Sequence, residues 1–260
     1  MELFDAHLHL QLMANGAEVA AELAAAGVGA LACGVDPRSW EADQALLGHA
    51  GSASSPIVVA AGLHPWWVAD GRCTQEQAEL LAAACARTRW IGEVGLDFSP
   101  RRTAARGPEP QVQAFERVCA AAAAASAPGQ ERVLSIHSVR AASACLDVLE
   151  HTGAAARCRC VFHWFSGSTD ELWRAVRAGC WFSVNEMGLA TGKGREYAKL
   201  IPAERLLLET DHPAVTDGPW SADQVRESLE RALRLVAQAR RADEAELRAQ
   251  ILANAQALLA

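Results

Sequence analysis

The chain has 260 residues, of which 51% are hydrophobic and 21% are charged. This composition excludes a disordered or collagen-like chain and provides enough apolar residues for a sizeable buried core. The formal net charge of −7 argues against a broad basic surface that wraps long nucleic acid, but it is compatible with a phosphate site neutralised by metal ions.

The amino-terminal segment MELFDAHLHL lacks the basic start and the apolar core of a secretory signal. The most apolar run, 118–125, is shorter than the roughly 20 residues that a membrane-spanning helix needs. Eight cysteines occur without a CxxC pair, in a chain too long to need disulfides for stability. We therefore expect a cytoplasmic protein with reduced thiols and no membrane contact.

Short apolar runs alternate along the chain with longer stretches rich in Ala, Leu, Glu and Arg, which is the pattern of repeated βα units. Strands are predicted at 3–5, 29–33, 57–63, 90–94, 133–136, 160–162, 180–184 and 205–209. Helices are predicted near 16–26, 39–50, 75–87, 111–126, 140–151, 169–178, 193–200, 222–239 and 243–259.

Eight strands that each precede a helix are the number found in a (β/α)8 barrel. No Pro/Ser-rich linker divides the chain, so residues 1–260 are expected to form one domain. The predicted fold is therefore α/β, a (β/α)8 TIM barrel rather than a doubly wound open sheet. Residues 99–110, which include three arginines, resemble a flexible insertion after the fourth strand.

The first predicted strand runs into the segment DAHLH, and alternation along a strand places His7 and His9 on one face. Further potential metal ligands lie at the ends of other predicted strands: Glu93, His137, His163 and Asp211. In a barrel all these strand ends meet at the carboxyl-terminal rim, where the active sites of this fold lie. Any one of these residues could be structural, but six together favour a metal centre.

The segments DAHLHL, GLHPWW, IGEVGLDF, LSIHSVRA, FHWFSG and LLETDHP occur in the order and spacing of the TatD-type metal-dependent nucleases. The chain resembles that family over nearly its whole length. The segments LSIHS, HWFSGS and GCWFSV are especially similar to the QatD subgroup, the TatD-like component of bacterial Qat anti-phage defence systems. The resemblance implies a TIM barrel of the metal-dependent hydrolase type with two divalent metal ions.

Matched to the family, the ligands are His7, His9 and Asp211 for one ion, His137 and His163 for the other, and Glu93 as a carboxylate that bridges both. Two such ions can activate water and stabilise the leaving oxygen of a phosphodiester. Nitrogen and oxygen donors without cysteine suit Mg, Mn or Zn. Because Asp211 could also accept the proton of the attacking water, Glu93 and Asp211 are the expected catalytic residues. Glu209 is either a carboxylate behind this site or a buried structural residue.

The expected substrate-binding residues are His64, Arg140, Trp164 and Ser166. The resemblance places His64 against substrate phosphate, and its alternative role is to cap the loop before Pro65. Aromatic faces at Trp66, Trp67 and Trp164 could stack unpaired bases, although tryptophans more often serve packing. Ser166 could bring a hydroxyl group to a phosphate, or it could only form the turn into the next helix.

Three features depart from the family pattern. The family usually has arginine two residues after the histidine of the fifth strand, whereas here Val139 takes that place and Arg140 follows. His212 follows Asp211 where a small or apolar residue is usual, and GLHP continues with two tryptophans where another histidine is common. These differences bear on substrate choice. The arginines of the 99–110 stretch could attract phosphate, but a solvated loop is the simpler interpretation.

The sequence therefore predicts a metal-dependent phosphodiester hydrolase, an exonuclease-like DNase that acts on single-stranded or frayed DNA ends in bacterial anti-phage defence. Other subunits of a defence system are expected as partners. Two alternatives remain open. One is a hydrolase of a small ester or amide on the same barrel, and the other is a non-catalytic subunit of a defence complex.

Overall fold

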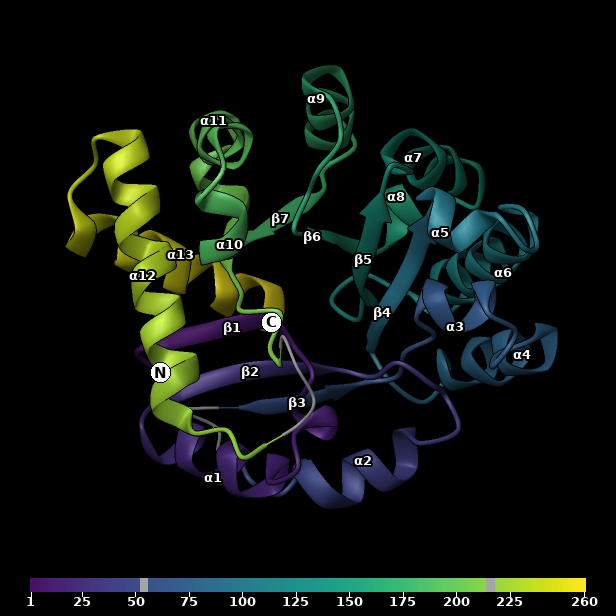
Figure 1. Cartoon of the computed structure of the whole chain (residues 1–260), viewed down its shortest axis with the longest axis horizontal. Coiled ribbons are helices and arrows are strands. Elements are labelled where there is room, and N and C mark those ends of the chain that lie inside the picture. Colours follow the sequence, from purple (N-terminus) through teal and green to yellow (C-terminus); the bar gives the residue numbers. More distant parts are fainter. Residues whose placement is uncertain (52–55, 214–217) are drawn as a thin grey trace. The chain divides into compact units, whose positions relative to one another are not determined.

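The chain forms two compact units in the computed structural model, which describes residues 1–51, 56–213 and 218–260. Unit 1 contains Met1–Ala32, Glu41–Val59 and Phe182–Ala260. Unit 2 contains Cys33–Trp40 and Ala60–Trp181. All eight predicted strands are present (Figure 1).

The strands of unit 1 form two parallel groups. In the first, β1 (Leu3–Leu8) pairs with β2 (Val28–Cys33), and β3 (Ile57–Ala60) follows β2. In the second, β7 (Trp181–Val184) pairs with β8 (Leu206–Leu208). Beyond β8, the amide of Asp211 donates to the carbonyl of His7 at 2.8 Å. The segment after β8 therefore lies beside the carboxyl end of β1.

Long amphipathic helices cover the strands of unit 1. The longest, α12 (Ala222–Arg240), buries Val225, Leu229, Leu233 and Val236, a spacing that forms one apolar stripe. It contacts β1 and β8, and so does α13 (Glu244–Leu259). The other helices of this unit are η1 (Leu10–Leu12), α1 (Gly16–Ala25), α2 (Trp40–Leu47), α10 (Glu186–Leu189), α11 (Gly192–Leu200) and η2 (Ala203–Arg205).

Unit 2 is built on three parallel strands in the order β4 (Trp90–Asp97), β5 (Val133–Val139) and β6 (Arg159–His163). The helix α6 (Glu109–Ala125) packs on β4 and on α4 (Gln75–Ala84). The remaining helices are α3 (Pro65–Ala69), α5 (Pro100–Thr103), α7 (Ala142–His151), α8 (Ala154–Arg157) and α9 (Thr169–Arg177) (Figure 1).

Four strands, β1, β4, β5 and β6, extend further at their carboxyl ends than the sequence indicated, whereas β3 and β8 end earlier. The polar residues His7, His137 and His163 were expected to follow their strands, but they lie within β1, β5 and β6. The backbone ladder pairs His137 with Gly95, whereas its register shifts between Asp5 and Leu8, the stretch that contains His7. The stretch 99–110 was wrongly expected to be an irregular insertion, because it contains α5 and the first turn of α6. Helices of one turn are too short to produce a recognisable hydrophobic period.

None of the eight cysteines forms a disulfide, and seven of them are buried. Burial raises the pKa of Cys73 to about 11 and that of Cys85 to about 12. Burial also raises the pKa of Cys119, Cys145 and Cys158. Among the residues that the structure describes, no helix is long and apolar enough to cross a bilayer.

Glu171 connects α9 to the start of α7. Its Oε1 accepts hydrogen bonds from the amide and hydroxyl of Ser143 at 2.9 and 2.6 Å, and its Oε2 accepts one from the amide of Ser168 at 2.6 Å. Ser168 in turn caps α9, which completes a capping box. Partial burial opposes ionisation of Glu171, but these hydrogen bonds dominate and lower its pKa to about 2.

We expect Glu171→Ala to lower the free energy of unfolding by about 1–2 kcal/mol at pH 7, the usual cost of a lost cap. Because the folded pKa lies below the unfolded value of 4.5, this contribution is present above about pH 5 and declines as the pH falls towards 2. Urea unfolding at pH 7 and pH 3 should show the difference between the two proteins shrink by about half. Asp170→Ala, at the adjacent exposed position, is the control. An equal difference at both pH values would contradict this account.

Candidate metal centres

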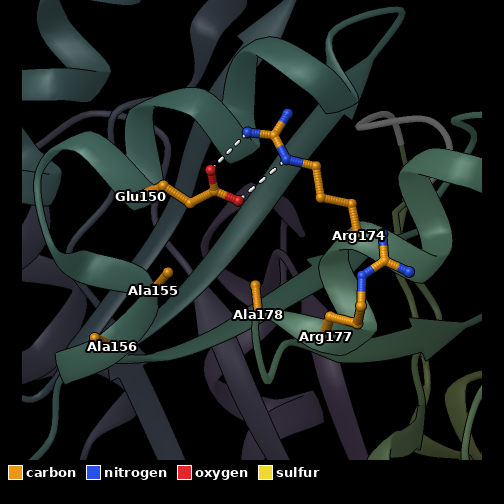
Figure 2. Close-up of a pocket in the computed structure, with 6 residues that line it drawn as sticks. All are labelled: Glu150, Ala155, Ala156, Arg174, Arg177 and Ala178. Atoms are coloured by element: carbon orange, nitrogen blue, oxygen red, sulfur yellow. Dashed lines mark hydrogen bonds and ion pairs between the residues drawn. The ribbon is translucent and has the colours of Figure 1, made fainter.

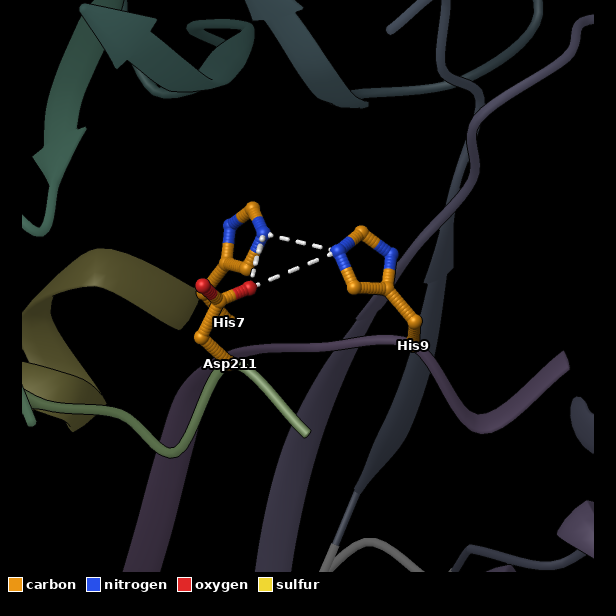
Figure 3. Close-up of side chains that lie close together, drawn as sticks. All are labelled: His7, His9 and Asp211. Atoms are coloured by element: carbon orange, nitrogen blue, oxygen red, sulfur yellow. Dashed lines mark hydrogen bonds and ion pairs between the residues drawn. The ribbon is translucent and has the colours of Figure 1, made fainter. Parts of the chain in front are cut away.

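His7, His9 and Asp211 form a compact group in unit 1, which we call cluster 1. The two Nε2 atoms lie 3.3 Å apart, and Oδ1 of Asp211 lies 3.7 Å from Nε2 of His7 and 3.6 Å from Nε2 of His9. Figure 3 shows the two rings and the carboxylate directed towards one another. His7 is fully buried, whereas 20% of the Asp211 side chain is exposed. The predicted convergence of the three side chains is therefore observed.

The spacing of cluster 1 fits a bound divalent cation. Two ligands that each lie about 2.1 Å from one ion, at a tetrahedral angle, are about 3.4 Å apart. The observed separations of 3.3, 3.6 and 3.7 Å are close to that value. At 3.6 Å and beyond, the imidazole and carboxylate atoms are too far apart for a good hydrogen bond. Cluster 1 therefore has the donors and the spacing of a metal site.

Asp5 supports cluster 1 from behind. Its Oδ1 accepts the amides of His7 and Thr210 at 3.1 and 3.0 Å, and its Oδ2 lies 2.6 Å from Oγ1 of Thr210. Asp5 is completely buried, and burial raises its pKa to about 8 despite these hydrogen bonds. The side chain ties β1 to the segment after β8, and thus fixes the backbone that carries His7 and Asp211.

We expect Asp5→Ala to destabilise the protein by about 3 kcal/mol, because it leaves two buried amides without an acceptor. Asp5→Asn should cost less, since its amide oxygen accepts the same two donors and its NH2 group faces the hydroxyl of Thr210. Metal affinity of the alanine variant should fall roughly 10- to 100-fold, as is typical when the support of a ligand is lost. Chemical unfolding and metal titration check both values, and equal losses in the two variants would contradict this role.

Two further residues near the segment after β8 are well packed. Oε1 of Glu209 accepts a hydrogen bond from Nδ2 of Asn185 at 2.8 Å, and Oε2 accepts one from the hydroxyl of Ser183. These contacts fit the structural alternative for Glu209, because they join the ends of β7 and β8. The ring of His212 lies 4.7 Å from that of Trp220, and burial lowers the pKa of this histidine.

Unit 2 carries a second group around Glu93, which we call cluster 2: His64, Glu93, His137 and His163. Oε1 of Glu93 lies 2.6 Å from Nδ1 of His137 and 2.8 Å from Nε2 of His163, and Oε2 lies 3.2 Å from Nε2 of His64. Glu93 is only 1% exposed. Three imidazoles thus surround one buried carboxylate.

The electrostatics of cluster 2 favour an ionised Glu93. Burial by itself raises the pKa of the carboxyl group, but the nearby His64 and His163 and the hydrogen bonds from His137 and His163 hold it well below its usual range. Burial lowers the pKa of His137, whereas Asp97 and Glu93 outweigh burial and raise it to about 9. A buried anionic carboxylate among imidazoles is a suitable donor set for a divalent cation that displaces the imidazole protons.

His64 differs from the other histidines of cluster 2 in its hydrogen bonding. It caps α3, and its Nδ1 accepts a hydrogen bond from the amide of Trp66 at 3.1 Å. In a neutral imidazole the other nitrogen then carries the proton, so Nε2 of His64 is a donor. A protonated nitrogen does not bind a cation. The candidate ligands of cluster 2 are therefore Glu93, His137 and His163, and His64 is oriented to donate a hydrogen bond.

A family model described as TatD related DNase matches residues 4–260 of the chain. The chain belongs to the TatD-related DNase family. The family expected from the sequence motifs is therefore confirmed, and the clusters described above contain the six residues that the TatD-type resemblance assigned to metal.

Among curated TatD relatives, the 3'-5' ssDNA/RNA exonuclease TatD of Escherichia fergusonii is 31% identical over 243 residues, which covers 90% of this chain and 88% of the relative. The human deoxyribonuclease TATDN3 is 32% identical over 138 residues. That match covers 50% of this chain, and the chain spans about half (47%) of TATDN3.

The TatD fold is confirmed by solved structures. The crystal structure of YJJV, a TATD homolog from Escherichia coli, superposes with a TM-score of 0.77 at 23% identity and covers 99% of this chain and 97% of that chain. The predicted α/β fold is thus that of the TIM-barrel metal-dependent hydrolases.

One residue next to cluster 2 was not predicted from the sequence. Asp97, at the end of β4, is 2% exposed and accepts hydrogen bonds from Nε1 of Trp66 at 2.5 Å and from the amide of Ser99 at 2.8 Å. Its Oδ2 also lies 3.4 Å from Nε2 of His137. Burial opposes ionisation, but these contacts lower the pKa of Asp97 below its usual value. The sequence signal that could have indicated Asp97 was its position: Glu93, Gly95 and Asp97 are every second residue of one strand, so their side chains share one face.

The expected substrate-binding residues of this TatD protein lie where strands end. Arg140 and Trp164 are exposed and follow β5 and β6 closely, and Ser166 is exposed two residues after Trp164. Arg140, Trp164 and Asp211 have positive φ angles of 53°, 40° and 57°. Such backbone conformations are costly for residues other than glycine and cluster at functional sites. The fourth such residue in the described part of the chain, Arg241, ends α12, so three of the four coincide with predicted functional residues.

A surface pocket of about 340 Å³ on unit 2 is lined by none of the predicted site residues (Figure 2). It is lined by Glu150, Ala155, Ala156, Arg174, Arg177 and Ala178. Arg174 is neutralised there by Glu150 and Asp147, each at 2.7 Å. Because its carboxylates are already paired with Arg174, the pocket lacks the converging donors of a metal site.

Proposed function

We propose that the chain is a metal-dependent phosphodiesterase with a single catalytic domain over residues 1–260, which hydrolyses single-stranded DNA from an end. The observation that carries the proposal is the presence of two buried histidine and carboxylate clusters with metal-ligand spacing. Divalent cations at such clusters supply Lewis-acid stabilisation of phosphate oxygens and lower the pKa of water. The name of the Escherichia fergusonii relative supports a single-stranded substrate and 3'-5' polarity.

The two acidic residues differ in accessibility, and this difference supports different roles. The side chain of Asp211 is 20% exposed, whereas that of Glu93 is 1% exposed. A group that takes a proton from water must be reachable by water. We therefore propose that Asp211 both binds a metal ion and accepts the proton of the attacking water. Glu93 binds a cation together with His137 and His163.

The residues beyond the ligands bind the substrate. His64 directs its Nε2 proton into cluster 2, where it donates to a phosphate oxygen. Arg140, Trp164 and Ser166 are exposed beside the strand ends that carry His137 and His163. We assign Arg140 and Ser166 to phosphate contacts and Trp164 to stacking against an unpaired base.

The test is cleavage of single-stranded DNA labelled at either its 5' or its 3' end, in Mg²⁺ or Mn²⁺, beside an EDTA control. We expect metal-dependent laddering, with loss of the 3' label first. A small carboxylic ester and a lactone are assayed in parallel. Hydrolysis of these compounds without cleavage of DNA would replace the proposal with a small-molecule hydrolase.

We further propose a cytoplasmic role in bacterial anti-phage defence, together with other subunits of a defence system. The proposal is supported by the similarity of LSIHS, HWFSGS and GCWFSV to the QatD subgroup. The test is phage plating on cells that carry the intact operon. Unchanged protection after deletion of this chain would refute the defence role, and unchanged protection with Glu93→Gln would show that the role is not catalytic.

A further inference from the structure

We propose that Arg102 is a phosphate-binding residue, which holds the phosphate next to the one that reacts and thereby selects nucleic acid over small phosphodiesters. The inference deepens the proposed function and rests on it. Arg102 lies in α5, nine residues after Glu93, in the stretch that the sequence indicated as a solvated loop. The structure instead gives this arginine a defined support.

The support is Trp66, which links Arg102 to cluster 2. The guanidinium carbon of Arg102 lies 4.0 Å from the centre of the Trp66 ring. The indole nitrogen of Trp66 donates to Asp97 at 2.5 Å, so the ring is held at its edge by a buried carboxylate. A cation stacked on an anchored indole loses side-chain freedom before any ligand binds.

The donors of Arg102 remain available for a ligand. Within the described part of the chain, its guanidinium makes no hydrogen bond and no ion pair with another residue. The group stacks on the Trp66 ring. A guanidinium carries five N–H donors in a fork that matches two oxygens of a phosphate. The side chain is only partly exposed, so it is neither buried in the core nor freely solvated.

Neighbouring arginines lack this combination. Nη1 of Arg106 donates to the carbonyl of Val68 at 3.4 Å. Arg72 lies over the Trp67 ring at 4.2 Å, but Asp70 already pairs with it at 2.7 Å. Arg101 is exposed and has no aromatic support. Arg102 is thus distinguished by both a support and unused donors.

Trp66 adjoins cluster 2 as well as Arg102. The Trp66 ring centre lies 4.8 Å from that of His64 and 6.1 Å from that of His137. Arg102 and two histidines of cluster 2 are therefore all neighbours of one indole. A phosphate held by His64 leaves the next phosphate of the same strand for Arg102, which a substrate with a single phosphate does not supply.

The first experiment compares Arg102→Ala with Arg101→Ala as the matched control. For a single-stranded octanucleotide, we expect Arg102→Ala to raise KM about 10- to 50-fold with kcat changed less than threefold, whereas Arg101→Ala changes KM less than twofold. Activity on bis(4-nitrophenyl) phosphate, which has one phosphate, should be the same in all three proteins. A KM for DNA that is unchanged in Arg102→Ala would overturn the inference.

A second experiment does not require catalysis. Fluorescein-labelled (dT)8 is titrated with metal-free protein, and anisotropy is measured at several salt concentrations. Arg102→Ala should raise Kd about tenfold and reduce the slope of log K against log [salt] by about 0.7, the value for one phosphate contact on a single strand. An unchanged slope would refute the phosphate contact. Failure of the wild-type protein to cleave DNA refutes the proposed nuclease, whereas this slope tests Arg102 in either case.

Trp66→Phe and Arg102→Lys refine the assignment. Trp66→Phe keeps an aromatic support but removes the N–H that is bound to Asp97, so its KM should lie between those of the wild type and Arg102→Ala. Arg102→Lys keeps the positive charge but loses the planar guanidinium that can bind two phosphate oxygens. Its affinity for DNA should lie between those of Arg102→Ala and the wild type. Full recovery by lysine would show a general charge effect and would contradict the two-oxygen contact.

Discussion

Glu93→Gln is expected to lower kcat/KM for single-stranded DNA by about 10³-fold or more. Metal-ion stabilisation contributes several kcal/mol to such reactions, and each 1.4 kcal/mol is a factor of ten. The substitution keeps the shape of the side chain but removes the negative charge that three imidazoles surround. It also directs an NH2 group towards histidine nitrogens, including the Nε2 donor of His64, so the affinity for the cation should fall as well.

Three measurements separate this effect from misfolding: kcat/KM at increasing Mn²⁺, metal content after gel filtration, and the unfolding midpoint. Glu79→Gln is the matched control, because Glu79 is exposed and pairs with Arg117 on the surface of the same unit. The control should keep its activity within twofold. A Glu93→Gln protein that is folded, binds the wild-type amount of metal and cleaves DNA normally would remove Glu93 from the catalytic machinery.

Asp211→Asn should lower kcat by about 10²- to 10⁴-fold, the range typical of a lost proton acceptor. Asparagine keeps the size of the side chain, but it accepts no proton at neutral pH. Excess Mn²⁺ should restore much of the metal content, because His7 and His9 remain, yet it should not restore the rate. This separation of occupancy from turnover distinguishes a proton acceptor from a residue that only binds metal.

Asp223→Asn is the control for this variant, since Asp223 is 77% exposed and pairs with Arg226 on α12. It should leave kcat unchanged within twofold. Complete recovery of the Asp211→Asn rate at saturating Mn²⁺ would mean that the proton leaves by another route. Asp211 would then remain a ligand without a role in proton transfer.

The strand count and the candidate ligands were predictable because parallel strands of an α/β fold are apolar and short, and because polar residues interrupt them where they end. The same rule caused the errors at His7, His137 and His163, whose polarity hides the fact that the strand continues. Only the backbone ladder, such as Gly95 opposite His137, reveals where pairing stops. The eight strands were thus correct in number, but four were predicted to end too early and two too late.

The missed features depend on contacts between residues far apart in the chain. Strand parity could have indicated Asp97, but not its hydrogen bond with Trp66, 31 residues earlier. The support of Arg102 by Trp66 likewise joins two segments that carry no common motif. The tautomer of His64 depends on a contact close in the sequence, the hydrogen bond from the amide of Trp66. That amide takes its position only when α3 forms. Periodicity describes which face a residue occupies, and it does not describe which distant side chain meets it there.

The buried cysteines bear on how metal loading can be measured. A thiol binds metal as thiolate, and a raised pKa keeps the thiols of Cys73, Cys85, Cys119, Cys145 and Cys158 protonated at neutral pH. These sulfurs therefore compete poorly for soft cations such as Zn²⁺ while the protein is folded. Metal counted on the native protein accordingly includes little metal bound by these five sulfurs, whereas unfolding exposes them as additional metal sites and raises the count.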